Sequence, residues 1–288
     1  MERAEIIGLS PIIIEPIVRA ALAEDLGRAG DITSDAIIPA EARARGILAA
    51  RQPGIVAGIE VAATAFRLLD PQTKVEVLRH DGDDVTAGAA IATVAGKARA
   101  LLSAERVALN FLCRLSGIAT ATRALVDAVQ GTRARVCDTR KTTPSLRALE
   151  KYAVRVGGGV NHRFGLDDAV LIKDNHIALA GGIGASVSKA RERLGHMVKI
   201  EIEVDRLEQV REAIDARADV IMLDNMPIPD MRRAAGMASA AGVVVEASGR
   251  ITAESAAAIA ATGVDMISAG WITHSAPILD IGLDFESD

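Results

Sequence analysis

The sequence contains few aromatic residues, few cysteines and no long apolar run. Only 2% of its 288 residues are Phe, Tyr or Trp, so Ala, Val, Ile and Leu must fill the core. Half of the residues are apolar, which is ample for a sizeable core in a chain of this length. No run approaches the roughly 18 apolar residues that a membrane span requires, so we expect no membrane insertion.

The two cysteines, Cys113 and Cys137, show neither metal-ligand spacing nor a disulfide framework. We expect both to be small, buried apolar side chains. The first residues lack a basic stretch followed by a long apolar stretch, so we expect no signal peptide. These features together favour a cytoplasmic protein.

Several motifs of other protein classes are also missing. The formal net charge is −5 and no basic run is interleaved with aromatics, so we expect no nucleic-acid partner. Neither a GxxxxGK[ST] loop nor a strand-linked GxGxxG is present, which argues against a nucleoside triphosphate loop and a dinucleotide fold. No Ser-His-Asp order and no Cys-His pair stands out, and no side chain resembles an activated nucleophile.

The first third of the chain mixes helical and extended patterns. Residues 11–27 show apolar residues at helical spacing, with Gly27 at the expected end of the helix. Residues 43–60 and 74–94 read as short strands interrupted by Gly and Pro turns. Residues 100–130 look helical throughout, and we expect this long helix to connect the β-rich part to the rest of the chain.

A regular alternation begins at about residue 133. Helix-like stretches such as RLEQVREAIDA separate short apolar runs, which predicts βαβ units and a parallel sheet. Polar residues end each run, and catalytic groups of α/β barrels lie at the carboxyl ends of the strands. We therefore expect an α/β barrel with fewer strands than usual. The runs are RARVCDT, AVLIKD, VKIEIEV, ADVIMLD, GVVVEAS and VDMISAG.

A set of cations lies near the ends of these runs or on the connecting helix. Arginine grips carboxylates and phosphates in a bidentate manner, while lysine acts as a point charge. In an acidic protein such a set predicts a polyanionic ligand. His162 adjoins one of the arginines. The cations are Arg106, Arg140, Lys141, Arg163 and Lys173.

Two carboxylates end neighbouring runs and should lie on the same rim as the cations. Glu203 lies within IEIEV, and Asp224 ends VIMLD. They could hold Mg²⁺, which prefers a few carboxylates plus substrate oxygens, or hydrogen-bond sugar hydroxyls. Glu201 lies two residues before Glu203, and strand alternation turns both to one face, so spacing alone does not separate their roles.

Small residues end the last two runs. Ser248-Gly249 and Ala269-Gly270 follow consecutive predicted strands. Loops of this kind, which lead into a helix N-terminus, bind phosphate through backbone N–H groups. Because two adjacent strands share this ending, we predict a phosphate-binding cradle there.

These motifs resemble the quinolinate phosphoribosyltransferase family, in the right order and over nearly the whole chain. The longest matching run is highly specific. The matching runs are EDLGRAGDIT (24–33), SAERVALNFLCRLSGIAT (103–120), DTRKTTPSLRALEKYAVRVGGGVNHRFGLDDAVLIKDNH (138–176), VIMLDN (220–225) and ISAGWITHS (267–275).

The resemblance implies an α/β fold with an N-terminal α/β sandwich and a C-terminal, partly open α/β barrel. We expect the sandwich at 1–115, the barrel at 116–274, and the tail from about 275 to 288 packed back on the sandwich. The implied activity converts quinolinate and phosphoribosyl pyrophosphate to nicotinate mononucleotide, pyrophosphate and CO₂ in NAD biosynthesis, with Mg²⁺. The resemblance also implies a homodimer, sometimes further assembled, in which Arg106 reaches the partner's site.

The resemblance also implies a role for each candidate residue. The arginines, His162 and Lys173 would hold the carboxylates of quinolinate, and Lys141 and Lys173 would face phosphoribosyl pyrophosphate. The expected catalytic residues are Lys141, Lys173, Glu203 and Asp224, of which Glu203 and Asp224 are the expected metal ligands. The expected substrate-binding residues are Arg106, Thr139, Arg140, Lys141, His162, Arg163, Lys173, Glu203, Asp224, Ser248, Gly249, Ala269 and Gly270.

The sequence departs from the family pattern at a few positions. Ser145 stands where Gly is common, and Ala247 and Arg250 lie in a stretch that often reads Val-Ser-Gly-Gly. Arg250 leaves open whether the phosphate loop keeps the family's form.

Two other functions fit parts of the pattern. A paralogue, such as those associated with molybdenum transport, would use another base; loss of a carboxylate-binding arginine would favour it, and none is lost. A non-catalytic sensor of phosphorylated sugars would be favoured by the loss of Glu203, Asp224 or Lys173, and all three are present.

Overall fold

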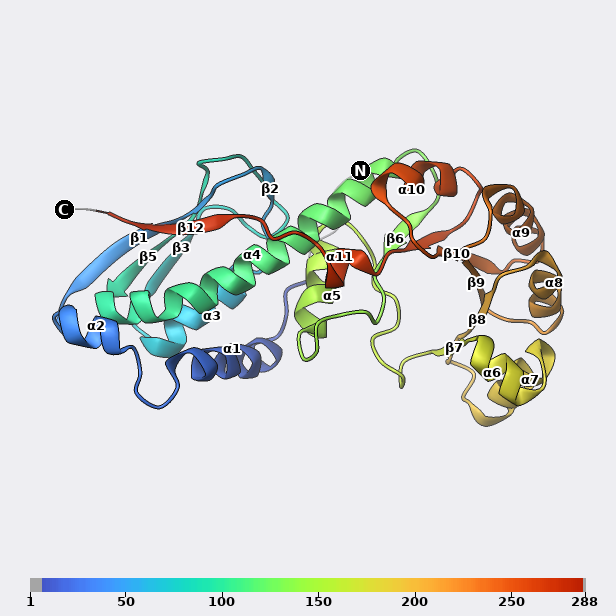
Figure 1. Ribbon diagram of the computed structural model, residues 1–288, viewed down its shortest axis with the longest axis horizontal. Coiled ribbons are helices and arrows are strands. Elements are labelled where there is room, and N and C mark those ends of the chain that lie inside the picture. The colour runs from blue at the N-terminus through green and yellow to red at the C-terminus, as the bar shows by residue number, and fades with distance from the viewer. Residues whose placement is uncertain (1–6, 287–288) are drawn as a thin grey trace. The chain divides into compact units, whose positions relative to one another are not determined.

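The computed structural model describes residues 7–286 (Figure 1). Contacts within the chain divide it into two compact units. Among the described residues, unit 1 comprises 7–123, 142–158 and 272–286, and unit 2 comprises 124–141 and 159–271. In the described part of the chain, no helix is both long enough and apolar enough to span a membrane.

Unit 1 is built on an antiparallel sheet in the order β12-β1-β5-β3. A separate two-stranded ladder joins β2 and β4. The strands are β1 (Arg43–Ala50), β2 (Gly54–Ile55), β3 (Lys74–Val77), β4 (Asp84–Val85), β5 (Ala90–Lys97) and β12 (Ile281–Phe285). The helices within this unit are α1 (Pro11–Leu26), α2 (Ile32–Ile37), α3 (Ile59–Leu69) and α5 (Arg147–Val156).

The turn into α3 explains why the stretch expected as strand at 43–60 ends in a helix. Gly58 adopts φ +93°, a left-handed conformation that suits glycine and interrupts extended backbone. The Asp81 carboxylate accepts the backbone N–H groups of Gly58 and Ile59 at 2.9 and 3.0 Å. The Tyr152 hydroxyl donates to the same carboxylate at 2.6 Å. Asp81 therefore satisfies free N–H groups at the start of α3.

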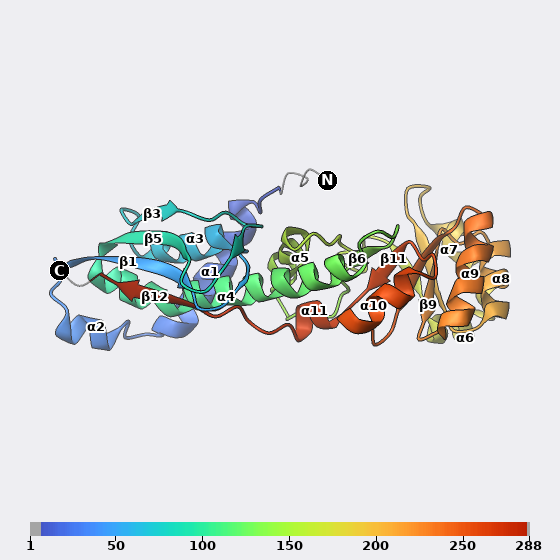
Figure 2. The same cartoon turned by 90° about the horizontal axis from the view of Figure 1, so that it is seen from above.

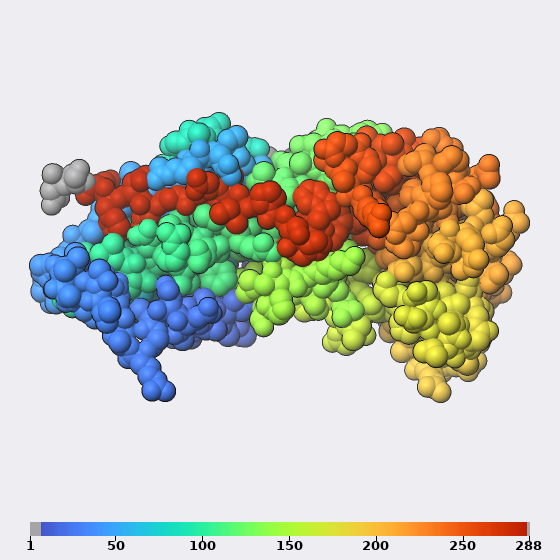
Figure 3. Space-filling model, in the orientation of Figure 1, coloured from blue at the N-terminus to red at the C-terminus, as the bar shows by residue number. Residues whose placement is uncertain are grey.

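The C-terminal segment completes the sheet of unit 1. Strand β12 pairs antiparallel with β1, from Gly46 opposite Phe285 to Ala50 opposite Ile281. In Figure 3 this red segment lies along the surface beside the green helix α4 (Ala98–Ala128). A Cβ atom at Gly117 of that helix would lie 2.0 Å from the Pro277 carbonyl oxygen, so this close approach requires glycine.

Helix α4 confirms the long helix expected at 100–130. It begins in unit 1, and its last residues belong to unit 2. Cys113 on this helix and Cys137 are both free and buried, as expected. One face of this helix carries apolar residues at helical spacing that are at most 1% exposed: Leu101, Ala104, Ala108, Leu112 and Leu115.

Unit 2 is a partly open α/β barrel. All six apolar runs form strands, which pair in parallel in the order β6-β11-β10-β9-β8-β7. Strands β6 and β7 form the two edges and are not paired with each other. The strands are β6 (Arg135–Cys137), β7 (Val170–Ile172), β8 (Ile200–Val204), β9 (Val220–Asp224), β10 (Val244–Ser248) and β11 (Met266–Ser268).

Helices cover the outer face of these strands. Figure 2 shows α7, α8 and α9 on one side of the sheet. Ile202, Ile221 and Val245 are completely buried, whereas alternate residues such as Glu203 and Asp224 turn to the other face and line a cavity. The helices of this unit are α6 (Asp174–Ala180), α7 (Ile183–Arg193), α8 (Leu207–Asp215), α9 (Ile228–Ala240) and α10 (Ala253–Ala260), and α11 (Trp271–His274) follows at its boundary.

A buried ion pair organises the packing of unit 1 around α4 and α5. Glu150 is fully buried and accepts two hydrogen bonds from the Arg114 guanidinium, at 2.7 and 3.1 Å. Its second oxygen accepts the Thr143 backbone N–H at 3.0 Å. Arg114 also donates to the Thr273 carbonyl oxygen. A single carboxylate therefore satisfies donors from two different segments.

We predict that Glu150→Ala lowers the free energy of unfolding by about 3–5 kcal/mol, because it leaves the largely buried Arg114 without its counter-charge. Urea unfolding followed by circular dichroism measures this change. The control is Glu60→Ala, which removes an exposed ion pair with Arg67 and should cost at most about 1 kcal/mol. Equal effects of the two substitutions would contradict the proposed role of Glu150.

Candidate active site

A cavity of about 610 Å³ lies at the carboxyl ends of the unit 2 strands. This is the position at which barrels of this type carry their ligands. Ten of the residues expected from the sequence line it: Thr139, Arg140, Lys141, His162, Arg163, Lys173, Glu203, Asp224, Ser248 and Gly249.

The strand ends bring cations and carboxylates together around this cavity. Lys173 directly follows β7 and begins α6, while Glu203 lies on β8 and Asp224 ends β9. The Lys173 ammonium group contacts the Glu203 carboxylate. Lys173 is 47% exposed and Glu203 is 18% exposed, so the pair lies at the mouth of the cavity and is open to a ligand.

The segment that spans the open edge of the barrel positions His162 and Arg163. Val160 forms a parallel bridge with Cys137 of β6, which extends the sheet beyond its edge strand. Asp138, at the end of β6, accepts the backbone N–H of His162 at 2.9 Å. The Arg163 guanidinium donates to the Ala169 carbonyl oxygen at 2.8 Å. Backbone and side-chain contacts therefore both fix this segment.

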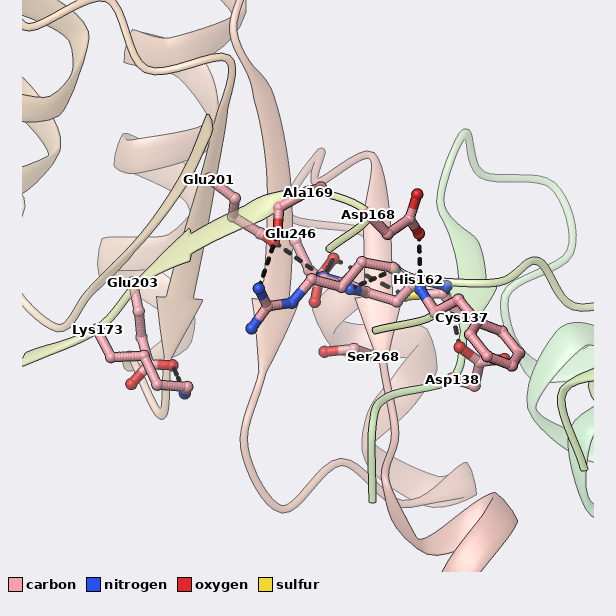
Figure 4. Close-up of polar contacts among 12 residues, drawn as sticks. Cys137, Asp138, His162, Asp168, Ala169, Lys173, Glu201, Glu203, Glu246 and Ser268 are labelled. Carbon is pink, nitrogen blue, oxygen red and sulfur yellow. Dashed lines mark hydrogen bonds and ion pairs between the residues drawn. The ribbon is translucent and has the colours of Figure 1, made fainter. Parts of the chain in front are cut away.

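Both ring nitrogens of His162 contact protein groups. Its Nδ1 accepts the Arg163 backbone N–H at 2.7 Å, and its Nε2 lies 2.8 Å from a Glu201 carboxylate oxygen. Figure 4 shows Glu201 directed at His162, whereas Glu203 is directed at Lys173. Glu201 lines a second cavity of about 280 Å³, which lies nearer the amino ends of the strands and thus beneath the first cavity. Glu203 lines the first cavity, at the carboxyl ends. The structure thus separates two glutamates that the sequence spacing left together.

Burial shapes the charges around this histidine. Burial, followed by the neighbouring Arg140, lowers the pKa of the Arg163 guanidinium. Burial, followed by the negative charge of Glu201, raises the pKa of Glu246 to about 7. One carboxylate oxygen on each of Glu201 and Glu246 is buried without a hydrogen-bond partner among residues 7–286. The protonation of Glu201 and Glu246 therefore decides how much negative charge lies near Arg163.

The loop after β10 turns through left-handed backbone at two consecutive residues. Gly249 adopts φ +102°, and a Cβ atom there would lie 2.3 Å from the Asn225 side-chain oxygen, so only glycine fits. Arg250 also adopts a positive φ, +49°, in the stretch where the family often has glycine, and it lines the cavity. The loop therefore keeps a left-handed backbone at a position that now carries a charged side chain.

Three residues of the expected set lie elsewhere. Ala269 is buried and donates its backbone N–H to the Cys137 carbonyl oxygen, and Gly270 is not among the residues that line the cavity. Arg106 is exposed on α4, in unit 1. Substrate binding by these three residues stays a prediction.

Sequence analysis missed several residues that line the cavity. Leu171, Met222 and Glu246 each lie two positions before a strand-end residue in the same cavity. Residues two positions apart on a strand share a face, so each of these residues could have been predicted from its strand-end partner. The sequence argument considered this spacing only for Glu201. The cavity is also lined by Asn225, Arg250 and Ser268.

The arrangement can hold a small polyanion. Five cations, at Arg140, Lys141, Arg163, Lys173 and Arg250, line one space, and Glu203 and Asp224 line the same space. Guanidinium and ammonium groups bind carboxylates and phosphates, and two carboxylates supply the hard oxygen ligands that Mg²⁺ prefers.

We predict that inorganic pyrophosphate binds this cavity and that Lys141→Ala weakens its binding about tenfold or more, because a hydrogen bond to a charged group contributes about 1.5–3 kcal/mol. Isothermal titration calorimetry gives both dissociation constants. The control is Lys189→Ala on α7, whose ammonium donates to the Ala180 carbonyl oxygen outside the cavity and whose loss should leave affinity unchanged. Unaltered affinity in Lys141→Ala would remove Lys141 from the anion site.

Comparisons with known proteins agree with this geometry. A probable carboxylating nicotinate-nucleotide pyrophosphorylase of Bacillus subtilis is 51% identical over 261 residues, which cover 91% of this chain and 89% of that protein. The carboxylating nicotinate-nucleotide pyrophosphorylase of Mycobacterium leprae is 46% identical over 274 residues, covering 93% of this chain and 95% of that protein.

A solved structure and two family models also match this chain. The nicotinate-nucleotide pyrophosphorylase of Francisella tularensis matches with a TM-score of 0.92 at 40% identity, over 98% of this chain and 99% of that chain. The family model for the N-terminal domain of quinolinate phosphoribosyl transferase matches residues 31–116, and the model for its C-terminal domain matches 118–284. The chain therefore belongs to the quinolinate phosphoribosyl transferase family.

Proposed function

We propose that the cavity of unit 2 is the site at which this chain converts quinolinate and phosphoribosyl pyrophosphate to nicotinate mononucleotide, pyrophosphate and CO₂. The observation that carries the proposal is the group of five cations around one space at the strand ends, which Glu203 and Asp224 also line. Quinolinate is a dicarboxylate and phosphoribosyl pyrophosphate is a polyphosphate, so both substrates need several cations.

The two ends of the cavity suit the two substrates. Arg140 lies near Arg163, since its charge helps to lower the Arg163 pKa, and two guanidinium groups match two carboxylates. Ser248 and Gly249 offer a turn for the 5′-phosphate, and Arg250 adds a positive charge beside it. Lys141 and Lys173 would face both substrates, as the sequence led us to expect.

We propose Glu203 and Asp224 as the residues that hold Mg²⁺. The fit rests on the donor set: both carboxylates line the cavity, each on one of two paired strands, and Mg²⁺ is usually held by one or two carboxylates plus substrate phosphates. When bound, Mg²⁺ would neutralise charge on the departing pyrophosphate. The Lys173 ammonium, which contacts Glu203, would contribute positive charge at the same end.

The reaction follows from electrostatics at this site. The pyridine nitrogen forms the bond to C1 of the ribose as the C1–O bond breaks, and pyrophosphate leaves with that electron pair. Asp224 or Glu203 would stabilise positive charge on the ribose. The ring nitrogen is then cationic, so the electron pair left on C2 when CO₂ departs is stabilised until a proton from solvent forms C2–H. The chain would bind and orient both substrates without a covalent intermediate.

We propose that Arg106 completes the site of a second copy in a homodimer. In support, Arg106 is exposed on α4, and its guanidinium forms no hydrogen bond or ion pair within residues 7–286. A location in the cytoplasm and the lack of a nucleic-acid partner stay predictions from the sequence.

The direct test supplies the protein with quinolinate, phosphoribosyl pyrophosphate and Mg²⁺ and measures nicotinate mononucleotide and CO₂. We expect both products in equal amounts, and neither after Mg²⁺ is removed with a chelator. Nicotinate should react at least about 100-fold more slowly, because a guanidinium without its carboxylate costs several kcal/mol. Comparable turnover of nicotinate would count against this cavity as a dicarboxylate site.

Subunit exchange tests the dimer. Arg106→Ala and Lys173→Ala should each be inactive alone. The first would remove a residue that acts in the partner's site, and the second a residue that acts in the site of its own subunit. In a mixed dimer one site collects both defects and the other none. Equal mixing makes about half of the dimers mixed, so about a quarter of wild-type activity should return. If exchange occurs and no activity returns, Arg106 does not act across the interface.

A further inference from the structure

Three titratable side chains meet beneath the substrate cavity. Glu201 on β8 is 6% exposed, Glu246 on β10 is 3% exposed, and the His162 side chain is 13% exposed. One polar atom from each lies within 4.8 Å of the other two. Figure 4 shows the three directed toward one another, apart from the Lys173–Glu203 pair. Strands β8 and β10 flank β9, so the two carboxylates approach His162 from opposite sides of β9.

The number of protons available to this group is limited. His162 Nδ1 accepts the Arg163 backbone N–H, so the ring can carry a proton only on Nε2. That N–H points to Glu201 at 2.8 Å, while Glu246 lies farther away at 3.6 Å. Each glutamate also has one buried oxygen without a partner among the described residues. One imidazole proton therefore serves two buried carboxyl groups.

Two carboxylate anions this close, in a buried site, repel each other strongly unless one takes up a proton. Glu201 receives the imidazole N–H and is therefore the anion. Glu246 is the more deeply buried of the two, and the Cys137 thiol lies 3.8 Å from its Oε2 atom. Burial and the charge of Glu201 raise the pKa of Glu246 to about 7, in agreement with this assignment.

We propose that Glu201, as an anion, and Glu246, as a neutral carboxylic acid, are positioning residues that fix His162 and leave their pair with one negative charge beneath Arg163. The proposal rests on the proposed function for its kinetic readouts. The Glu201 charge opposes the lowering of the Arg163 pKa, so it helps to keep that guanidinium cationic. A second negative charge in this position would repel the dianion quinolinate and leave phosphoribosyl pyrophosphate less affected.

A pH dependence follows from the groups that face Glu246. These are Glu201 from β8, His162 from the segment before β7, Cys137 from β6 and Ser268 from β11. Met222, its neighbour on β9, does not titrate. Glu246 is neutral below pH 7 and ionises above it, so the negative charge under the cavity grows as pH rises. The KM for quinolinate should therefore rise above pH 7 in the wild-type enzyme.

The test is a matched pair of isosteric variants, Glu246→Gln and Glu201→Gln, with Glu254→Gln on the surface of α10 as control. At pH 6, Glu201→Gln should raise the KM for quinolinate about tenfold more than Glu246→Gln does, because an amide replaces a neutral acid well and an anion badly. The KM for phosphoribosyl pyrophosphate should change little in both. Between pH 6 and pH 8.5 the KM for quinolinate should rise in the wild-type enzyme and stay nearly constant in Glu246→Gln.

A second readout does not depend on activity or on ligand. Infrared difference spectra between wild type and Glu246→Gln at pH 6 should contain the C=O stretch of a protonated carboxylic acid, and this band should be lost at pH 8.5. The proposal is wrong if that band is absent, or if Glu246→Gln impairs quinolinate binding as much as Glu201→Gln. If wild type makes no nicotinate mononucleotide, the proposed function fails, while the infrared result still decides the protonation of Glu246.

Discussion

Unit 2 depends on the two-residue period of its parallel strands. One set of side chains, including Ile202, Ile221 and Val245, is buried on the outer face beneath the helices. The alternate set turns inward, where Glu203 and Asp224 meet the cations of the strand-end loops. The same alternation that secures the hydrophobic core therefore gathers the charged groups. A slip of one residue in strand register would exchange the two faces and lose both the core and the cavity.

The second requirement is charge balance within the cavity. Five cations line one cavity, and burial followed by repulsion from Arg140 lowers the pKa of Arg163. Carboxylates at the mouth and beneath the cavity oppose that repulsion in the absence of substrate. The strands already hold these charged side chains in place, so the side chains need to move little when a ligand binds. Such preorganised charge is what makes electrostatic catalysis effective.

The sequence predicted the six strands and most of the cavity because strand-end position is a local property. It did not predict the pairing of Glu201 with His162, since that depends on side chains brought together from a strand and a loop 39 positions apart. Gly58 and the carboxylate that caps α3 were also missed. Ser145 and Arg250, noted as departures from family glycines, both adopt positive φ, so the backbone shape persists at a cost of about 1–2 kcal/mol each.

The pairing of β12 with β1 bears on how the molecule is made. A ribosome releases the chain from its N-terminus, so the edge of the unit 1 sheet beside β1 has no partner until residues 281–285 emerge. All residues of unit 2 precede that point. The residues of the barrel therefore emerge before β12 does, and unit 1, whose residues begin to emerge first, is completed after them. Until then β1 exposes a row of unpaired backbone groups, and nascent chains on one polysome are open to edge-to-edge association.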